Sequence, residues 1–183
     1  GIIDCDAHYG DGTDDIIEQL ELHDHIKHWT FGGVFSRGRF DQVLLLDELG
    51  LAINSMKSDG VELIVFQAGA DPHEGDPLGG YMTSEEMRER DQFVFEKCRD
   101  QQIPVVWGLA GGYSKDEFGG ISPVLALHRA TMIECLRAFP TEGNKMTTEK
   151  THDAVSSSPE NSPAESEQTP TASSEPLKKR IQM

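Results

Sequence analysis

Two carboxylates and an imidazole lie close together near the start of the chain, within residues 4–13 (DCDAHYGDGT). If residues 2–8 form a strand, the alternation of side chains places Asp4, Asp6 and His8 on one face. Carboxylate oxygens and imidazole nitrogens are ligands of Zn²⁺ and related metals, so this spacing indicates a metal site at a strand end. Asp and Gly also cluster in ordinary strand-to-helix turns. The spacing alone leaves both interpretations open.

Two later glycine-rich segments carry further side chains capable of chemistry. Residues 69–80 (GADPHEGDPLGG) contain Asp71, and a Gly-Gly-Tyr segment ends at Tyr113. Together, Asp6, His8 and Asp71 would supply two oxygens and one nitrogen, which suits a catalytic Zn²⁺ with an open position. The Tyr113 hydroxyl could donate a hydrogen bond to a developing oxyanion near that metal. Without these neighbours, Tyr113 would be interpreted as a surface-loop tyrosine.

Strands and helices alternate along the part of the chain that must position these segments. Apolar periodicity predicts strands at residues 2–8, 26–31, 61–68 and 104–109, and helices at residues 14–20, 40–56, 83–99 and 122–138. This alternation predicts an α/β fold with a largely parallel sheet. Ligands of such sheets bind beyond the carboxyl ends of the strands, which is where the three polar segments fall.

Individual residues indicate where these helices begin and which of their faces are buried. Thr13 is expected to cap the first helix, with Ile16, Ile17 and Leu20 on its buried side. A capping-box spacing begins at Thr83. The strand at 61–68 is almost continuously apolar, which is typical of a parallel strand covered on both faces.

Composition restricts the class of protein. The formal net charge of the 183 residues is −16, and residues 141–183 hold seven acidic and five basic groups, so most of the negative charge lies in the first 140 residues. Such a body argues against nucleic-acid binding, which needs clustered Lys and Arg, and is compatible with cations. The three cysteines form no CxxC pair, and we expect neither a signal peptide nor a membrane span. An intracellular location, cytoplasmic or nuclear, is expected.

The composition changes after residue 139. Residues 140–183 are rich in Ser, Thr, Pro and Glu and lack apolar periodicity, so they are predicted to form a disordered tail. We expect residues 1–139 to form the folded domain. The tail, or an exposed sheet edge, could contact protein partners.

The three polar segments resemble the motifs of one enzyme family. Residues 4–13 resemble the DxDxHxGDG motif of the zinc-dependent histone deacetylase family, and residues 67–80 are similar to its second metal motif. Residues 109–113 (LAGGY) resemble its glycine-tyrosine loop. These motifs are most similar to those of the bacterial and class II-like branch, in which DPLGG is usual. The resemblance covers residues 1–139 and implies a three-layer, parallel-sheet arginase/deacetylase-like fold, incomplete at the N-terminus.

The resemblance implies a role for each residue of the zinc site. Asp6, His8 and Asp71 would bind Zn²⁺, and Tyr113 would stabilise the tetrahedral oxyanion. Leu78 would line the narrow tunnel for the acylated amine.

It also implies supporting roles around that site. Gly111 and Gly112 would border the substrate tunnel. Asp4, with backbone carbonyls nearby, would hold a structural K⁺. Asp4 and Asp11 match two aspartates that orient a tandem histidine pair acting as general base and acid.

The sequence departs from the family in one respect: it contains no His-His pair. The family places that pair upstream of the opening motif. We interpret His23, His25 and His28 as part of a helix-to-strand connection, His73 as a loop residue and His128 as a satisfied helix histidine.

A manganese ureohydrolase such as arginase is a related alternative, because it shares the architecture. Its paired metals need bridging carboxylates where this sequence has Gly10 and His73, so one metal is favoured over two.

These observations predict a zinc-dependent hydrolase that removes acetyl groups from lysines of histones or other proteins, or from small amines such as polyamines. Because the chain opens on Gly1 within an apparent interior strand, we interpret it as a fragment or cleaved product that is weakly active or inactive. The alternative is a non-catalytic deacetylase-like interaction module.

Overall fold

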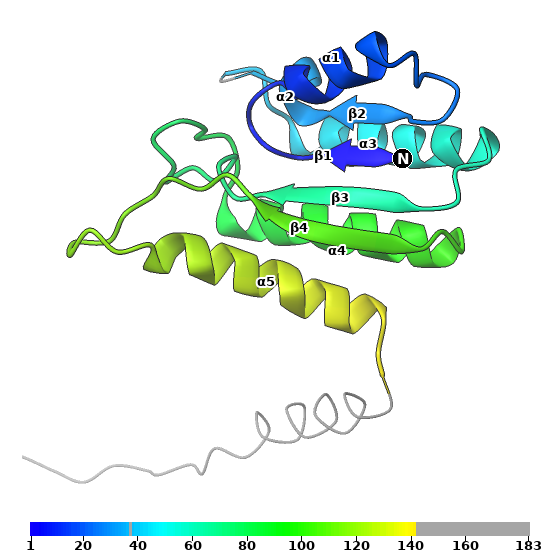
Figure 1. The fold of residues 1–183 in the computed structure, drawn as a ribbon. Coiled ribbons are helices and arrows are strands. Elements are labelled where there is room, and N and C mark those ends of the chain that lie inside the picture. Colours follow the sequence, from blue (N-terminus) through cyan, green and yellow to red (C-terminus); the bar gives the residue numbers. More distant parts are fainter. Residues whose placement is uncertain (37, 142–183) are drawn as a thin grey trace, which may run out of the picture. The chain divides into compact units, whose positions relative to one another are not determined.

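A four-stranded, fully parallel sheet forms the centre of the folded part of the chain (Figure 1). The computed structural model describes residues 1–36 and 38–141; the predicted tail lies almost entirely outside these residues. The strands are β1 (Ile2–Asp4), β2 (His28–Thr30), β3 (Ile64–Gly69) and β4 (Val105–Ala110), in the order β2-β1-β3-β4. The prediction of an α/β fold with a parallel sheet is therefore confirmed.

The connections between the strands are helical. The helices are α1 (Asp11–Gln19), α2 (Phe31–Val34), α3 (Gln42–Ser58), α4 (Ser84–Asp100) and α5 (Ser122–Ala138). Helices α3 and α4 lie behind the sheet, α1 lies in front of it beside β2, and α5 packs against α4 (Figure 1). Helix α4 begins as predicted, because Thr83 and Glu86 form both hydrogen bonds of a capping box. None of the described helices is long and apolar enough to span a membrane.

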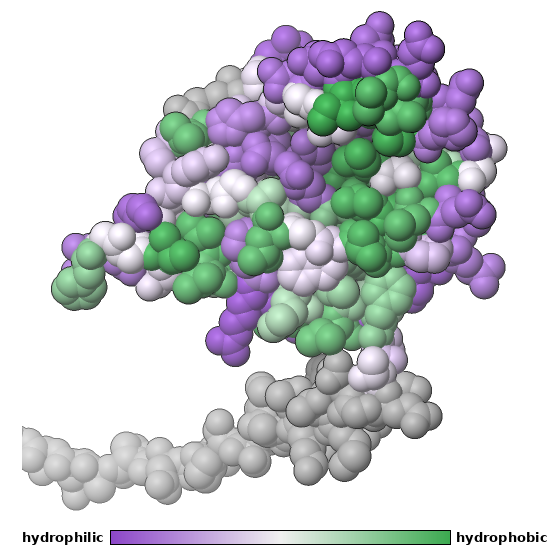
Figure 2. Space-filling view, in the orientation of Figure 1, coloured by the Kyte–Doolittle hydropathy of each residue, from purple (hydrophilic) through white to green (hydrophobic). Residues whose placement is uncertain are grey.

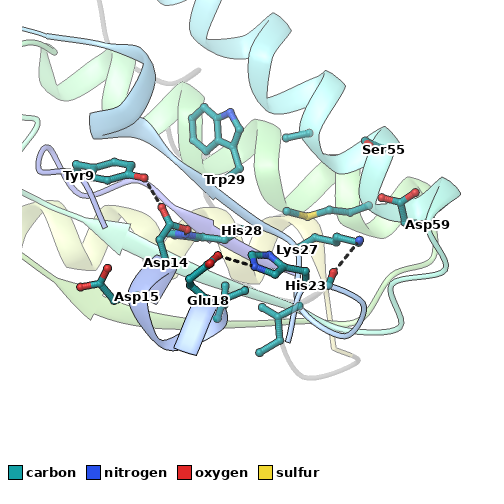
Figure 3. A pocket seen from close by; sticks show the side chains of 14 residues that line it. Tyr9, Asp14, Asp15, Glu18, His23, Lys27, His28, Trp29, Ser55 and Asp59 are labelled. Atoms are coloured by element: carbon teal, nitrogen blue, oxygen red, sulfur yellow. Dashed lines mark hydrogen bonds and ion pairs between the residues drawn. The ribbon is translucent and has the colours of Figure 1, made fainter. Parts of the chain in front are cut away.

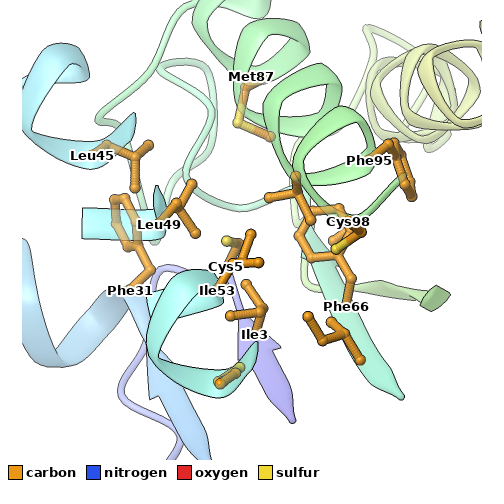
Figure 4. Close-up of a cluster of buried hydrophobic side chains, with 14 of the residues drawn as sticks. Ile3, Cys5, Phe31, Leu45, Leu49, Ile53, Phe66, Met87, Phe95 and Cys98 are labelled. Atoms are coloured by element: carbon orange, nitrogen blue, oxygen red, sulfur yellow. The ribbon is translucent and has the colours of Figure 1, made fainter. Parts of the chain in front are cut away.

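The hydrophobic core lies between the sheet and helices α3 and α4 (Figure 4). Ile3 of β1 and Phe66 of β3 point from the sheet toward Leu49 of α3 and Phe95 of α4, and all four are fully buried. The Phe66 and Phe95 rings meet edge to face, with centroids 5.5 Å apart. This layer fixes the strands whose carboxyl ends carry the polar segments.

The opposite face of the sheet remains partly open in the described chain. Val65 of β3 and Val106 of β4 pair in register, and their exposed fractions are 42% and 50%. Apolar side chains gather on this face of the molecule in Figure 2. The prediction that the strand at 61–68 is covered on both faces is therefore wrong within the described residues, because α1 extends only over the β1–β2 side.

The first helix differs from its prediction. It begins at Asp11, because the carbonyl of Gly10 accepts the N–H groups of Thr13 and Asp14, and Gly10 rather than Thr13 is the N-cap residue. Ile17 is buried as expected, but Ile16 and Leu20 are exposed. The sheet reaches only one side of this short helix.

Candidate metal centre

The chain leaves β1 at Asp4, four residues earlier than predicted. The Asp4 carboxylate accepts the backbone N–H of Asp6 at 3.0 Å, and the Asp6 carboxylate accepts that of His8 at 2.9 Å. Such local side-chain to backbone bonds compete with a strand ladder, so residues 5–8 form a loop. The prediction that Asp4, Asp6 and His8 share one strand face is therefore wrong.

This loop nevertheless brings together the predicted zinc ligands. One ligand atom each of Asp6, His8 and Asp71 lies within 4.8 Å of the others, and we call these three residues the ligand triad. His8 Nδ1 lies 2.9 Å from Asp6 Oδ1 and 2.9 Å from Asp71 Oδ2. The backbone N–H of Ala7 donates to Asp71 Oδ1 at 3.1 Å, which ties the loop after β1 to the loop after β3.

The electrostatics of the ligand triad favour a bound cation. Burial, together with the neighbouring Asp6 carboxylate, raises the pKa of Asp71 to about 6. A hydrogen bond to Asp6, with added attraction from Asp71, raises the pKa of His8. Asp71 Oδ2 is buried, and the nitrogen 2.9 Å from it, His8 Nδ1, lies equally close to Asp6 Oδ1. Two carboxylates compete for too few donors, an arrangement that a metal ion would neutralise.

The glycine of the third polar segment leaves room for that ion. Gly111 has a φ of +55°, and a Cβ at this position would lie 2.5 Å from Asp71 Oδ1 and 2.8 Å from Asp6 Oδ2. Only a residue without a side chain leaves this side of the carboxylates accessible. The donor set and the space therefore fit a single divalent cation such as Zn²⁺.

Asp76 joins the two loops that carry the predicted substrate-contacting residues. Its Oδ2 accepts the backbone N–H of Tyr113 at 2.6 Å, and its Oδ1 accepts that of Leu78 at 2.9 Å. The side chains of Tyr113 and Leu78 are about half exposed, and Gly112, with a φ of +94°, packs closely on Val124. Sequence reasoning missed Asp76, although an Asp before Pro in a glycine-rich loop is a turn signal.

Asp4 and Asp11, the two predicted supporting aspartates, lie outside the ligand triad. Asp4 is buried, and its Oδ1 also accepts the side-chain amide of Gln67 at 3.1 Å. Burial raises the pKa of Asp4. Asp11 is the exposed first residue of α1, and its carboxylate accepts the N–H of Gly12.

A second histidine–carboxylate group lies between α1 and β2, and Tyr9, Asp14 and His28 form it (Figure 3). We call it the His28 cluster. His28 Nδ1 lies 2.7 Å from Asp14 Oδ1, and the Tyr9 hydroxyl donates to Asp14 Oδ2. The His28 side chain is 3% exposed, and its Nε2 lies 4.0 Å from Asp4 Oδ2. The interpretation of His28 as a connecting residue is wrong, because it begins β2.

The other histidines lie apart from these groups. His73 is a loop residue, as predicted, and its Nε2 bonds with the Ser84 hydroxyl at 2.9 Å, next to the start of α4. His128 is buried in α5, but its Nδ1 has no hydrogen-bond partner among the described residues, so the prediction of a satisfied histidine is wrong.

Comparisons with known proteins agree with the motifs. Residues 53–128 match the model of the histone deacetylase domain, a stretch that includes Asp71, Leu78 and Tyr113. Over 55 residues the chain is 42% identical to histone deacetylase 2 of Arabidopsis thaliana, covering 30% of this chain and 14% of that protein. Over 148 residues it is 28% identical to an uncharacterized protein of Picosynechococcus sp., covering 70% of this chain and 47% of the relative.

A solved structure has a similar fold. The crystal structure of acetylpolyamine aminohydrolase from Burkholderia pseudomallei superposes with a TM-score of 0.50 at 13% identity, covering 74% of this chain and 44% of that one. The chain thus spans less than half the length of each of these proteins. Residues 53–128 thus match the histone deacetylase domain family, and the order of the motifs and the parallel sheet agree with that match.

Proposed function

We propose that this chain forms the metal-binding part of a zinc-dependent deacetylase. The observation that carries the proposal is the convergence of Asp6, His8 and Asp71 beside a glycine that leaves their oxygens accessible. We assign residues 1–139 to the deacetylase domain and residues 140–183 to a tail.

The residues around the ligand triad would perform distinct tasks in amide hydrolysis. When bound, Zn²⁺ would polarise the acetyl carbonyl and acidify a water molecule. Tyr113, whose backbone is fixed by Asp76, would donate its hydroxyl proton in a hydrogen bond to the developing oxyanion. Leu78, fixed by the same carboxylate, would line the passage for the acylated amine together with Gly111 and Gly112.

We propose an acetylated lysine or an acetylated small amine as the substrate. A solved structure of similar fold is an acetylpolyamine aminohydrolase, and a relative is a histone deacetylase. The net charge of −16 is compatible with cationic substrates of either kind.

Asp4 would bind a second ion in the proposed deacetylase. Its buried carboxylate and the carbonyls of the adjacent loop would hold a structural K⁺, for which oxygen ligands are suitable. Asp4 and Asp11 would also orient a pair of acid–base histidines, which this sequence does not contain. We therefore propose that the chain by itself binds zinc but turns over little or no substrate.

The open sheet face supports the second candidate, a non-catalytic interaction module. Val65 and Val106 leave apolar surface exposed on the face opposite α3 and α4 (Figure 2). A protein partner that covered this face would use the chain as a binding domain.

Zinc content and turnover, measured on the same preparation, separate these functions. We expect about one equivalent of zinc in the full chain, its loss in the Asp71→Asn variant, and little turnover of an acetyl-lysine peptide or an acetylated polyamine. A chain that takes up no zinc contradicts the metal site. Metal without turnover after a His-His-containing upstream segment is added favours the interaction module.

A further inference from the structure

A fully buried arginine contacts the backbone beside the ligand triad. Arg90 of α4 is 0% exposed, and its Nη1 donates to the carbonyl of Gly69 at 2.9 Å and to that of Cys5 at 3.3 Å. Cys5 immediately precedes Asp6, and Gly69 stands two residues before Asp71. One guanidinium nitrogen therefore joins the two backbone segments that present the ligands.

The guanidinium is itself held in place by neighbouring side chains. Its Nε donates to Asp91 Oδ1 at 2.8 Å, and Nη2 lies 2.7 Å from the same oxygen. Thr131 of α5 donates its hydroxyl to the other oxygen of Asp91 at 2.6 Å. The Arg90 Cζ also lies 5.9 Å from the centroid of the Phe66 ring. Contacts from α4, α5 and β3 thus fix a planar group whose donors cannot rotate independently.

The backbone held by Arg90 has little room to move. A Cβ on Gly69 would lie 2.5 Å from the Cα of Asp6 and 2.7 Å from the carbonyl oxygen of Cys5. The loops after β1 and β3 are thus in close backbone contact at the point where Arg90 joins their carbonyls. A change in their separation would move Asp6 relative to Asp71.

We infer that Arg90 is a positioning residue of the metal centre, which sets the distance between the Asp6–His8 loop and Asp71 by clamping the carbonyls of Cys5 and Gly69. This inference rests on the proposed function, because it requires the ligand triad to bind a metal. Partners outside the ligand set commonly tune metal affinity in this way by orienting the ligands.

A buried ion pair also contributes to folding, so the test must separate positioning from stability. Replacing a buried ion pair by apolar residues of similar volume is often neutral for stability, whereas removing one charge alone is costly. The double variant Arg90→Met/Asp91→Leu removes both charges together with the clamp. The Thr131 hydroxyl retains an acceptor in the Leu127 carbonyl, at 3.3 Å.

The chain offers a matched control on the same helix. Arg88 pairs with Glu85 and Glu134, and Glu134 also pairs with Arg137, so Arg88→Met removes ion pairs of α4 that involve neither β1 nor β3. Arg90→Lys is a second test variant, because a single ammonium keeps the charge but cannot reproduce the guanidinium fork.

The experiment measures zinc affinity by competition with a chromophoric chelator and ligand geometry by the visible absorption of the Co²⁺-substituted chain. We expect the double variant to unfold cooperatively, to bind zinc about tenfold to a hundredfold more weakly, and to show an altered Co²⁺ spectrum. Arg90→Lys should show a smaller change in the same direction, and Arg88→Met should match the wild type.

Two outcomes overturn the inference and can be told apart. If the wild type binds zinc and a folded Arg90 variant keeps its affinity and Co²⁺ spectrum, the positioning role is wrong and the proposed function stands. If the wild type binds no zinc, both fail. Should the double variant not fold, Arg90→Lys decides by the same criteria.

Discussion

The ligand triad and the His28 cluster are histidine–carboxylate groups of similar composition, and they differ in how their oxygens are used. In the His28 cluster, one Asp14 oxygen bonds with His28 and the other with Tyr9. In the ligand triad, the buried Asp71 Oδ2 shares one nitrogen, His8 Nδ1, with Asp6 Oδ1. The two histidines also differ in exposure: the His28 side chain is 3% exposed, and that of His8 is 53% exposed.

The pKa values of the two aspartates differ in the same way. Hydrogen bonds from Tyr9 and then His28 lower the pKa of Asp14, whereas burial raises the pKa of Asp71. A carboxylate with enough donors is stable as an anion, and one buried with too few requires a proton or a cation. Residue types alone do not distinguish a structural cluster from a candidate binding site; two carboxylates that share one histidine nitrogen do.

The largest expected effect is on zinc affinity, which should depend on His8 and not on His28. His8→Ala removes one of three ligands, so zinc affinity should fall by more than about a hundredfold, beyond the usual loss for an outer partner. Its exposed side chain should leave the free energy of unfolding within about 0.5 kcal/mol of wild type. Chelator competition and urea denaturation measure the two quantities. Wild-type zinc affinity in this variant would remove His8 from the site.

A pair of glycines provides the next comparison. Gly111→Ala places a Cβ 2.5 Å from Asp71 Oδ1 at a positive φ, so zinc affinity should fall by at least about tenfold, the scale of an outer-partner loss.

Gly10→Ala instead places a Cβ 2.7 Å from Asp4 Oδ2 and 2.9 Å from His28 Cε1. It should cost about 1–3 kcal/mol of stability through overpacking. Isothermal titration with zinc and thermal unfolding of both variants test the pair. Equal zinc affinities in the two variants would contradict the assignment.

The His28 cluster should affect stability rather than metal binding. His28→Leu removes the bond to a charged Asp14, which typically contributes about 1.5–3 kcal/mol, but Asp14 can be hydrated. We therefore expect a loss of about 1–2 kcal/mol in the free energy of unfolding, with little change in zinc affinity. A loss of zinc binding in a folded variant would show that His28 belongs to the metal centre.

The smallest expected effects concern stability as a function of pH. In the zinc-free chain, Asp71 and Asp14 should change it in opposite directions. The pKa of Asp71 is raised from 3.8 to about 6, so the folded state binds more protons in this range and stability should fall as pH rises from 4 to 6. The pKa of Asp14 is lowered, so its contribution is present above pH 3.8 and is lost as pH falls through the folded-state pKa.

Urea denaturation between pH 3 and 7 measures these slopes. Asp71→Asn should remove the first dependence and Asp14→Asn the second. Zinc affinity of the wild type should weaken below pH 6, because Asp71 must lose its proton to bind metal. An unchanged profile in Asp71→Asn would place the titration elsewhere.

The sequence predicted the parallel sheet and the closeness of Asp6, His8 and Asp71, because both depend on strong local signals. The apolar run that contains β3 and the capping box at Thr83 needed no tertiary information. Asp6 and His8 were singled out by their spacing near the end of a predicted strand and Asp71 by its place after one, and the three lie close together. The local bonds that end β1 at Asp4 were not predicted, since alternation alone does not show where side chains bond back to the backbone.

The buried ion pair was missed, although the sequence carried a signal for it. Arg90 and Asp91 follow Met87 by three and four residues and precede Val94 by four and three. They therefore lie within the buried stripe of α4, where two charges would be anomalous without partners. His28 gave no comparable signal, because its burial depends on how α1 lies over β2.

The central position of β1 has a consequence for the order of assembly. This strand comes first in the chain but lies between β2 and β3, and Ala7 meets Asp71 across 64 positions of sequence. Closing so long a loop costs entropy before any contact forms, so docking of β1 should be a late step of folding. The three residues of the ligand triad cannot converge until that step is complete, so zinc uptake during refolding is expected to follow the docking of β1.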